Sequence, residues 1–420
     1  MTDFTPAIKV YTLPPNAPHT DPLVEITGYI DYSIDISRGT SQYINPPYPG
    51  QTTVTLLFDT NIIPNVQIGT WMEIHVYKAS TSAYVVMHSG YVTYRSSSYR
   101  AHGMTGYILE WRFSLTTGIS ILQNTDWYNN TTTTATTSVN IQNVETATGV
   151  FLWSTINGST KWQDYGPTSW ANVDTNRIST LPNIIIGTET SSTTLNSGFR
   201  NVWDDLTTLT YGVYGYMYES PNGDINVKFP QAEAVAMTSS ITLTQSMLSP
   251  DIAGGDRVDE LRNTVTINEF DAVVSTYYDD NSIADYGQRS GTLATYLNTT
   301  LDAANVANTI LNGIAYPLLS TETISVNLLN PIFTNAEREL LLYSPLGMLV
   351  TVEAPEPMGG TLEYLSIGCN FQISKNAFIL YLQLVPYSVA RSSINWNQVL
   401  YNYTWTSYGV AYPTQKWQDL

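Results

Sequence analysis

Hydrophobic and polar residues alternate along much of the stretch from residue 24 to residue 122. The alternation runs through QTTVTLLFDT, GTWMEIHVYK, AYVVMHSGYVTYR and YILEWRFSLTTG, and clusters of Gly, Pro, Asn or Ser separate these runs. A period of two is typical of half-buried β-strands, and short strands at near-regular spacing are typical of a barrel or sandwich. The pattern predicts that this stretch is β throughout.

The same alternation returns near the C-terminus in MLVTVEAP, GTLEYLSIGCNFQIS and AFILYLQLVPY. These closely spaced strands predict a second β-barrel. Cys369 lies inside an alternating run, so we interpret it as a buried strand residue. Just before the strands, FTNAERELLLYSPLG places Thr334 three residues ahead of Glu337, which is the capping-box signature of a helix start.

Between the two β-rich regions the pattern is mixed. NVWDDLTTLTYG places Val202, Leu206 and Leu209 on one face of a helix, with a glycine at its end. YGYMYESPNGDINVKF has the form of a β-hairpin that turns at Asn222 and Gly223. A helix that leads into a hairpin predicts a small α+β domain.

A third block begins with the strand pattern DELRNTVTINEF and continues into a helical pattern in TTLDAANVANTILNGIAYP. We expect this helix to begin at a threonine N-cap and to end at Gly313. Its predicted buried face consists of Leu301, Ala304, Ala307, Ile310, Leu311 and Ile314.

At 420 residues the chain is too long for one hydrophobic core, so several domains are expected. The low-complexity tract QNTDWYNNTTTTATTS, residues 123–138, predicts an exposed loop and a domain boundary. The fold class is predicted as mainly β and α+β overall, with two β-barrel domains and smaller α+β domains between them. The expected parts are an N-terminal barrel (1–125), an α+β domain with helix and hairpin (126–250), a connecting strand and helix (251–320), a C-terminal barrel (321–390) and an aromatic extension (391–420).

Composition excludes some classes of function. Charged residues are only 12% of the chain and the net charge is −18, so the summed field repels phosphate backbones and we expect no specific nucleic-acid binding. A single cysteine leaves no intrachain disulfide and no zinc site with several Cys ligands. The N-terminus has no basic, apolar leader and no window of about 18 residues is apolar enough to span a bilayer, so we expect no membrane contact.

Motifs for chemistry are few. The histidines His19, His75, His88 and His102 have no pair at the i, i+4 spacing of a helical metal site, and we interpret them as structural. No GxSxG, P-loop, HExxH or EF-hand pattern is present. The sequence therefore predicts no catalytic residue, no cofactor and no enzyme activity.

The segment YYDDNSIADYG brings together Asp279, Asp280 and Asp285. Such carboxylates can form a cation site or a carboxylate pair for glycoside cleavage. The segment lacks the glycine-punctuated spacing of a calcium loop, so we favour a solvated loop and predict no metal site.

The last 31 residues form an extension that is rich in aromatic side chains but could not build a core alone. Trp and Tyr dominate the energetics of interfaces, so we expect the extension to dock on a partner, against the alternative that it packs on its own domain. The predicted docking residues are Trp396, Tyr401, Tyr403, Trp405, Tyr408, Tyr412 and Trp417.

The order of several motifs resembles the minor tail proteins of long-tailed bacteriophages. VEITGYIDYSIDISRG, PGQTTVTLLFDT, IGTWMEIHV and HSGYVTYR are similar to the N-terminal module of that family. FRNVWDDLTTLTYGVYGYMYESPNGDINVKF is similar to its helix and hairpin, DELRNTVTI to a strand, NSIADYGQRSG to a Tyr-Gly-x-Arg-Ser segment, and residues 340–386 to its closing barrel. The resemblance covers about residues 20 to 390, and leaves residues 123–138, 151–196 and the aromatic extension unmatched.

The resemblance implies a structural protein of the virion, made in the host cytoplasm. It implies a tail-tip or baseplate hub, often a trimer, whose tail-tube-like barrels close the end of the tail tube and anchor other tail-tip proteins. The implied partners are further copies of the chain, a distal tail or tail tube ring, the tape measure protein and receptor-binding proteins. The alternatives are a receptor- or carbohydrate-binding tail protein, a distal tail adaptor ring protein, and a glycoside hydrolase that acts on a cell wall.

Overall fold

The computed structural model of the chain describes most of the predicted β-rich regions. The described residues are 7–14, 22–41, 43, 45–59, 61–102, 106–129, 131–144, 184–186, 189–229, 239–248, 255–256, 261–270, 274–317, 319–320, 323–353 and 361–387. The seven predicted docking residues, from Trp396 to Trp417, lie outside this part of the chain. None of the helices that the structure describes has both the length and the apolar character needed to cross a bilayer.

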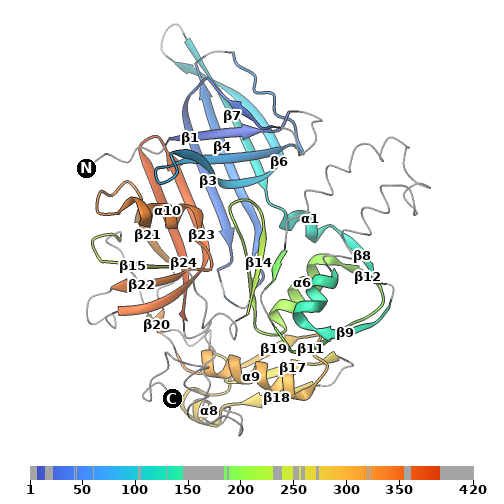
Figure 1. The fold of residues 1–420 in the computed structure, drawn as a ribbon. Helices are drawn as coiled ribbons and strands as arrows, with labels where there is room; N and C mark the ends of the chain where they lie inside the picture. The colour runs from blue at the N-terminus through green and yellow to red at the C-terminus, as the bar shows by residue number, and fades with distance from the viewer. Residues whose placement is uncertain are drawn as a thin grey trace, which may run out of the picture.

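A 12-stranded sheet dominates the molecule, as Figure 1 shows. The N-terminal region contributes β1 (Ile8–Thr12), β2 (Val24–Ile26), β3 (Tyr29–Gly39), β4 (Tyr48–Phe58), β5 (Trp71–Lys78), β6 (Ala83–His102) and β7 (Gly106–Thr116). The later region contributes β15 (Ser240–Leu243), β21 (Thr323–Asn327), β22 (Leu349–Glu353), β23 (Thr361–Ser374) and β24 (Ala377–Pro386). The strand order is β15-β22-β23-β3-β4-β7-β6-β5-β1-β2, with β24 paired to β23 and β21 paired to β24. The prediction of a mainly β fold is confirmed.

The two β-rich regions are joined in one sheet because β3 pairs with β23. The antiparallel register runs from Gly39 opposite Gly368 to Ser33 opposite Ser374. Gly39 has a φ of +90°, and a Cβ there would lie 2.2 Å from the backbone oxygen of Ile367, so only glycine fits at this close approach. Strands from both regions bury their apolar side chains in one core. The closure of either region into a barrel stays a prediction.

A second core lies below the sheet and contains most of the middle of the chain. The helix α1 (Ile119–Gln123) leads into β8 (Asp126–Asn129) and β9 (Thr133–Thr136), which pair with β12 (Gly198–Asn201) and β11 (Ser192–Leu195). The prediction of an exposed loop over residues 123–138 is therefore wrong. Threonine is β-branched and suits a strand, and the partner strands of β8 and β9 lie far along the chain, beyond residue 190.

The predicted helix and hairpin of the middle region are confirmed. The helix α6 (Val202–Tyr211) begins at Asn201, whose side chain accepts hydrogen bonds from the backbone N–H groups of Trp203 and Asp204. The hairpin consists of β13 (Tyr216–Glu219) and β14 (Ile225–Lys228), and β14 also pairs in parallel with β10 (Ile184–Ile186). Gly223 in the turn has a φ of +89°.

Asp205 organises the second core from the first turn of α6. Its carboxylate accepts hydrogen bonds from Nε1–H of Trp127 at 2.7 Å, from Nη2–H of Arg200 at 2.6 Å and from the hydroxyl of Tyr296 at 2.9 Å. Only 2% of the Asp205 side chain is exposed. The network joins β8, β12 and α6 to the segment that follows β19 (Ser290–Ala294).

The third block forms a small sheet in which β17 (Thr264–Asn268) lies between β18 (Val274–Tyr278) and β19. The helix α9 (Thr300–Ile314) packs on this sheet and has the expected threonine N-cap, Thr299. Three details of the predicted helix are wrong. Gly313 lies inside the helix, Leu301 is 71% exposed, and Ala304 and Ile314 are only partly buried. The buried face contains Ala303, Val306, Ala307, Ile310 and Leu311.

The predicted solvated loop around Asp279 is a helix cap instead. Asp279 accepts a hydrogen bond from the backbone N–H of Ser282 and begins α8 (Asp280–Tyr286). Asp280 lies in its first turn, where negative charge complements the helix dipole. This helix precedes β19. The short strands β16 (Gly255–Asp256) and β20 (Leu319–Ser320) come before and after this region in the chain and pair with each other in an antiparallel register.

The capping box at Thr334 and Glu337 is confirmed at the start of α10 (Asn335–Tyr343). Cys369 is a buried residue of β23, as predicted. His75 and His88 lie in β5 and β6.

Candidate functional surface

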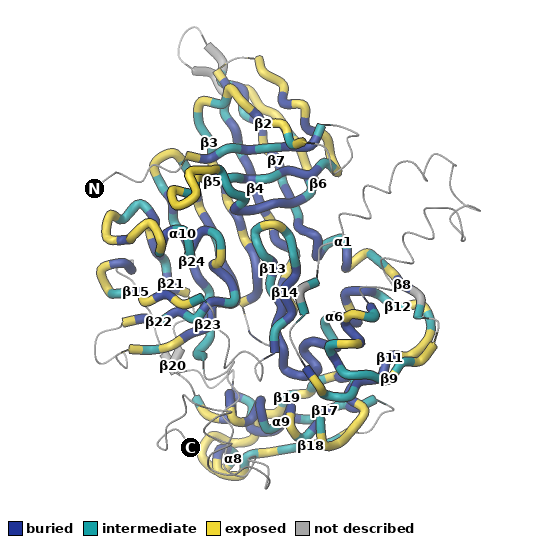
Figure 2. The backbone as a smooth tube through the Cα atoms, in the orientation of Figure 1, coloured by how far each residue is buried: buried dark blue, intermediate teal, exposed yellow. Residues whose placement is uncertain are grey.

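The large sheet buries one face and leaves the other open. On β3 the side chains of Ile34 and Ile36 are fully buried, whereas those of Ser33, Asp35 and Ser37 are exposed. The same alternation continues on the neighbouring strands, as Figure 2 shows. We call the outward-pointing residues of β3, β4, β7 and β23 the open face. It consists of Asp31, Ser33, Asp35, Ser37, Gln51, Thr53, Thr55, Leu57, Glu110, Arg112, Ser114, Thr116, Asn370, Gln372 and Ser374.

Strand register aligns these polar side chains in rows across the sheet. One row runs from Ser374 through Ser33, Thr55 and Arg112 to Ser96 on β6. The next row runs from Gln372 through Asp35, Thr53 and Ser114 to Tyr94. The open face is thus made mainly of hydroxyl and amide groups.

The charges on the open face are few and mainly negative. Its carboxylates are Asp31, Asp35 and Glu110, and its cation is Arg112. Arg38, at the end of the same strand as Asp31, points the other way and is only 4% exposed. Because cations hold phosphate groups through counterion release, a face with this composition gives DNA little to bind.

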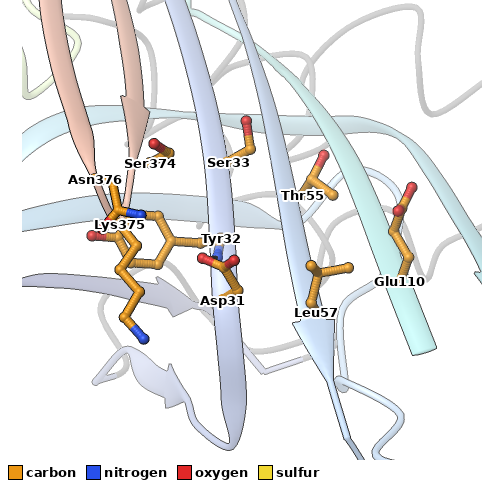
Figure 3. A pocket seen from close by; sticks show the side chains of 9 residues that line it. All are labelled: Asp31, Tyr32, Ser33, Thr55, Leu57, Glu110, Ser374, Lys375 and Asn376. Atoms are coloured by element: carbon orange, nitrogen blue, oxygen red, sulfur yellow. Dashed lines mark hydrogen bonds between the residues drawn. The ribbon is translucent and has the colours of Figure 1, made fainter. Parts of the chain in front are cut away.

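A groove of 270 Å³ lies at one end of the open face. Figure 3 shows that Asp31 and Ser33 come from β3, Thr55 and Leu57 from β4, and Glu110 from β7. The rest of the lining is Tyr32 on β3, Ser374 at the end of β23, and Lys375 and Asn376 in the turn between β23 and β24.

The chemistry of the groove favours hydrogen bonding over proton transfer. Asp31 accepts a hydrogen bond from the backbone N–H of Tyr32 at 2.9 Å. Burial raises the pKa of the Tyr32 hydroxyl, and the neighbouring Asp31 raises it further, so the phenol is neutral at pH 7. Neutral hydroxyls, two carboxylates and the Lys375 ammonium can together contact hydroxylated or charged groups.

Large apolar side chains are also exposed at the end of the sheet, in the connection between β4 and β5. Ile63 and Ile68 are 73% and 69% exposed. The backbone beneath them is fixed, because Nε1–H of Trp111 donates to the backbone oxygen of Ile62 at 3.1 Å and Arg95 donates to that of Val66. These exposed apolar side chains on an ordered connection are available for contact with another protein surface.

Neither a protein-family model nor a curated protein sequence matches this chain. The likeness is in the structure. The tail protein from Neisseria meningitidis MC58 superimposes with a TM-score of 0.56 at 13% sequence identity, covering 91% of this chain and 96% of that one. The chain has the fold of a phage tail protein. The 43 kDa tail protein of prophage MuSo2 from Shewanella oneidensis agrees, with a TM-score of 0.53 at 11% identity over 91% of this chain and 99% of its own.

The tail-protein fold confirms the resemblance of the ordered motifs at the level of fold. Two buried polar residues were not predicted from the sequence. Alternation along YIDYSIDISRG puts Arg38 on the same face of the strand as Ile34 and Ile36, and a spacing of three residues puts Asp205 on the same helical face as Val202. Both polar residues are buried, and both patterns already contained that signal.

Proposed function

We propose that the protein is a structural component of a phage tail tip, a baseplate hub that closes the end of the tail tube. The support for this proposal is a fold shared over 91% of the chain with a tail protein, together with an open sheet face that is polar and poor in cations. In this proposal the protein catalyses no reaction. The sheet serves as a rigid wall.

The proposed arrangement is a ring, with a trimer as the expected form, in which the open face of each copy lines the channel. A ring covers the outer strands of each sheet with a neighbouring subunit, which removes an aggregation hazard. The exposed isoleucines between β4 and β5 then provide contacts to a neighbouring copy or tail ring. The proposed partners are a distal tail or tube ring, the tape measure protein and other tail-tip proteins.

Site-specific labelling tests where the open face lies in the assembly. The chain has one cysteine, Cys369, and it is buried, so a Thr55→Cys variant presents a single reactive thiol. A Leu301→Cys variant provides the matched control, because Leu301 is 71% exposed on α9, away from the open face.

The labels are a small maleimide and a maleimide attached to a globular protein too large for a channel of DNA width. We expect assembled Thr55→Cys to react with the small reagent alone, and assembled Leu301→Cys to react with both. If assembled Thr55→Cys reacts with both reagents, the open face lies outside the ring. If it reacts with neither, the face is a subunit contact, and in both cases the proposal fails.

A further inference from the structure

The β13–β14 hairpin packs against one end of the large sheet, and buried titratable side chains meet at this junction. Figure 2 shows the hairpin mostly buried beside β3 and β23. Arg38 on β3, His88 on β6 and Glu219 at the end of β13 are 4%, 1% and 2% exposed. Charged groups are rarely buried this deeply unless they are paired.

Gly50 on β4 creates the space in which two of these groups approach one another. A Cβ at Gly50 would lie 3.0 Å from Oε2 of Glu219 and 3.2 Å from Cγ of Arg38. The backbone N–H of Gly50 donates instead to the hydroxyl of Thr117 at 2.8 Å. The Glu219 carboxylate of the hairpin therefore lies beside the Arg38 side chain of the sheet, close enough for the Arg38 charge to lower the pKa of Glu219.

These groups lack direct hydrogen-bond partners in the part of the chain that the structure describes. This holds for the guanidinium nitrogens of Arg38, both carboxylate oxygens of Glu219 and Nε2 of His88. The Thr117 hydroxyl and the backbone N–H groups of Ile119 and Gly50 lie near enough to Glu219 to lower its pKa, but none of them reaches hydrogen-bond geometry with its carboxylate. Native proteins pair almost all buried polar groups, so this cluster carries a cost that calls for an explanation.

Glu219 is the member of the cluster that changes charge near neutral pH. Burial raises its pKa to about 7, even though the Arg38 cation lowers it. Burial and the same cation keep the pKa of His88 well below its ordinary value, so His88 is neutral. From β23, Cys369 faces the same guanidinium, and burial raises the pKa of its thiol.

We propose that Glu219 and Arg38 form a proton-controlled latch between the β13–β14 hairpin and the large sheet. The protonated carboxyl is neutral and lets the hairpin pack. Ionisation places a carboxylate in a buried site where the nearby donors and the Arg38 cation do not offset its loss of hydration, so the hairpin loosens and water enters. The hairpin belongs to the second core, so the joint between the two cores becomes weaker as pH rises through neutrality.

Hydrogen exchange with mass spectrometry tests the latch at pH 6 and pH 8, after correction for intrinsic exchange rates. A carboxyl with a pKa of about 7 when closed and about 4.5 when open makes opening about tenfold more frequent at pH 8 than at pH 6. We expect this loss of protection in β13 and β14, and constant protection in β4 and β7. Glu219→Gln removes the loss, whereas Glu363→Gln, at an exposed glutamate of β23, retains it.

Three results would overturn the proposal. The first is a rise of less than about twofold in the frequency of hairpin opening between pH 6 and pH 8. The second is an equal rise in β4 and β7, and the third is the same rise in the Glu219→Gln hairpin. If the Glu219→Gln protein does not fold, the unaltered protein still tests the proposal. The latch then requires that hydrogen-exchange protection falls between pH 6 and pH 8 in the hairpin and stays constant in β4.

Discussion

The Asp205→Ala variant tests whether one carboxylate holds the second core together. The substitution leaves Arg200, whose side chain is only 17% exposed, without its ion pair and leaves the Trp127 indole N–H without its acceptor. Breaking a buried ion pair by removing one partner costs about 3–5 kcal/mol. A buried donor left unpaired costs about 1–3 kcal/mol, and the two contributions overlap. We therefore expect a loss of about 3–5 kcal/mol in the free energy of unfolding of the second core.

Urea denaturation, followed by circular dichroism and tryptophan fluorescence, measures this loss. The matched control is Asp204→Ala, because Asp204 is exposed and occupies the same helical turn. It should cost no more than about 1 kcal/mol, through the helix dipole. Adding Arg200→Met to Asp205→Ala removes the orphaned guanidinium and should recover part of the loss. A loss in Asp205→Ala below about 1 kcal/mol, or equal to that of Asp204→Ala, would refute the reasoning.

Three further predictions concern a turn, the C-terminal extension and the open face. Gly69 has a φ of +85°, and a side chain there would meet no other part of the protein within 4 Å, so Gly69→Val should lower the free energy of unfolding by about 1–3 kcal/mol through backbone strain alone. Asparagine tolerates positive φ better, so Gly69→Asn should cost less. Thermal unfolding measures both losses, and equal stability of all three proteins would contradict the prediction. Deleting Trp396–Leu420 should leave the unfolding temperature unchanged but weaken assembly, because Trp and Tyr side chains supply much of the binding energy of interfaces. Light scattering measures assembly, and the docking prediction fails if the shortened chain assembles as well as the intact one. On the open face the carboxylates of Asp31, Asp35 and Glu110 outnumber the single cation of Arg112, so fluorescence anisotropy should detect no micromolar affinity for duplex DNA. A salt-sensitive affinity in that range would contradict the prediction.

Local patterns allowed much of the secondary structure to be predicted. Alternation identified β4 and β24, helical spacing identified α6, and the pair Thr334 and Glu337 identified the start of α10. Each of these signals lies within a few residues of the element that it specifies. The predicted capping geometry depends on backbone groups of the same turn, which explains its accuracy.

Long-range pairing was not accessible from the same patterns. Nothing in β3 or β23 alone indicates that Ser33 lies opposite Ser374, because register across distant strands depends on the whole sheet. The strands β8 and β9 were missed for the same reason, since their partners follow much later in the chain. The meeting of Arg38 with Glu219 also depends on this tertiary arrangement.

The most direct test of the proposed hub is an image of the purified assembly, with its mass determined by native mass spectrometry. The account predicts a closed ring, with three copies as the expected number, in which the open face of β3, β4, β7 and β23 lines the channel. A chain that stays monomeric under assembly conditions, or a ring in which this face points outward, would contradict it.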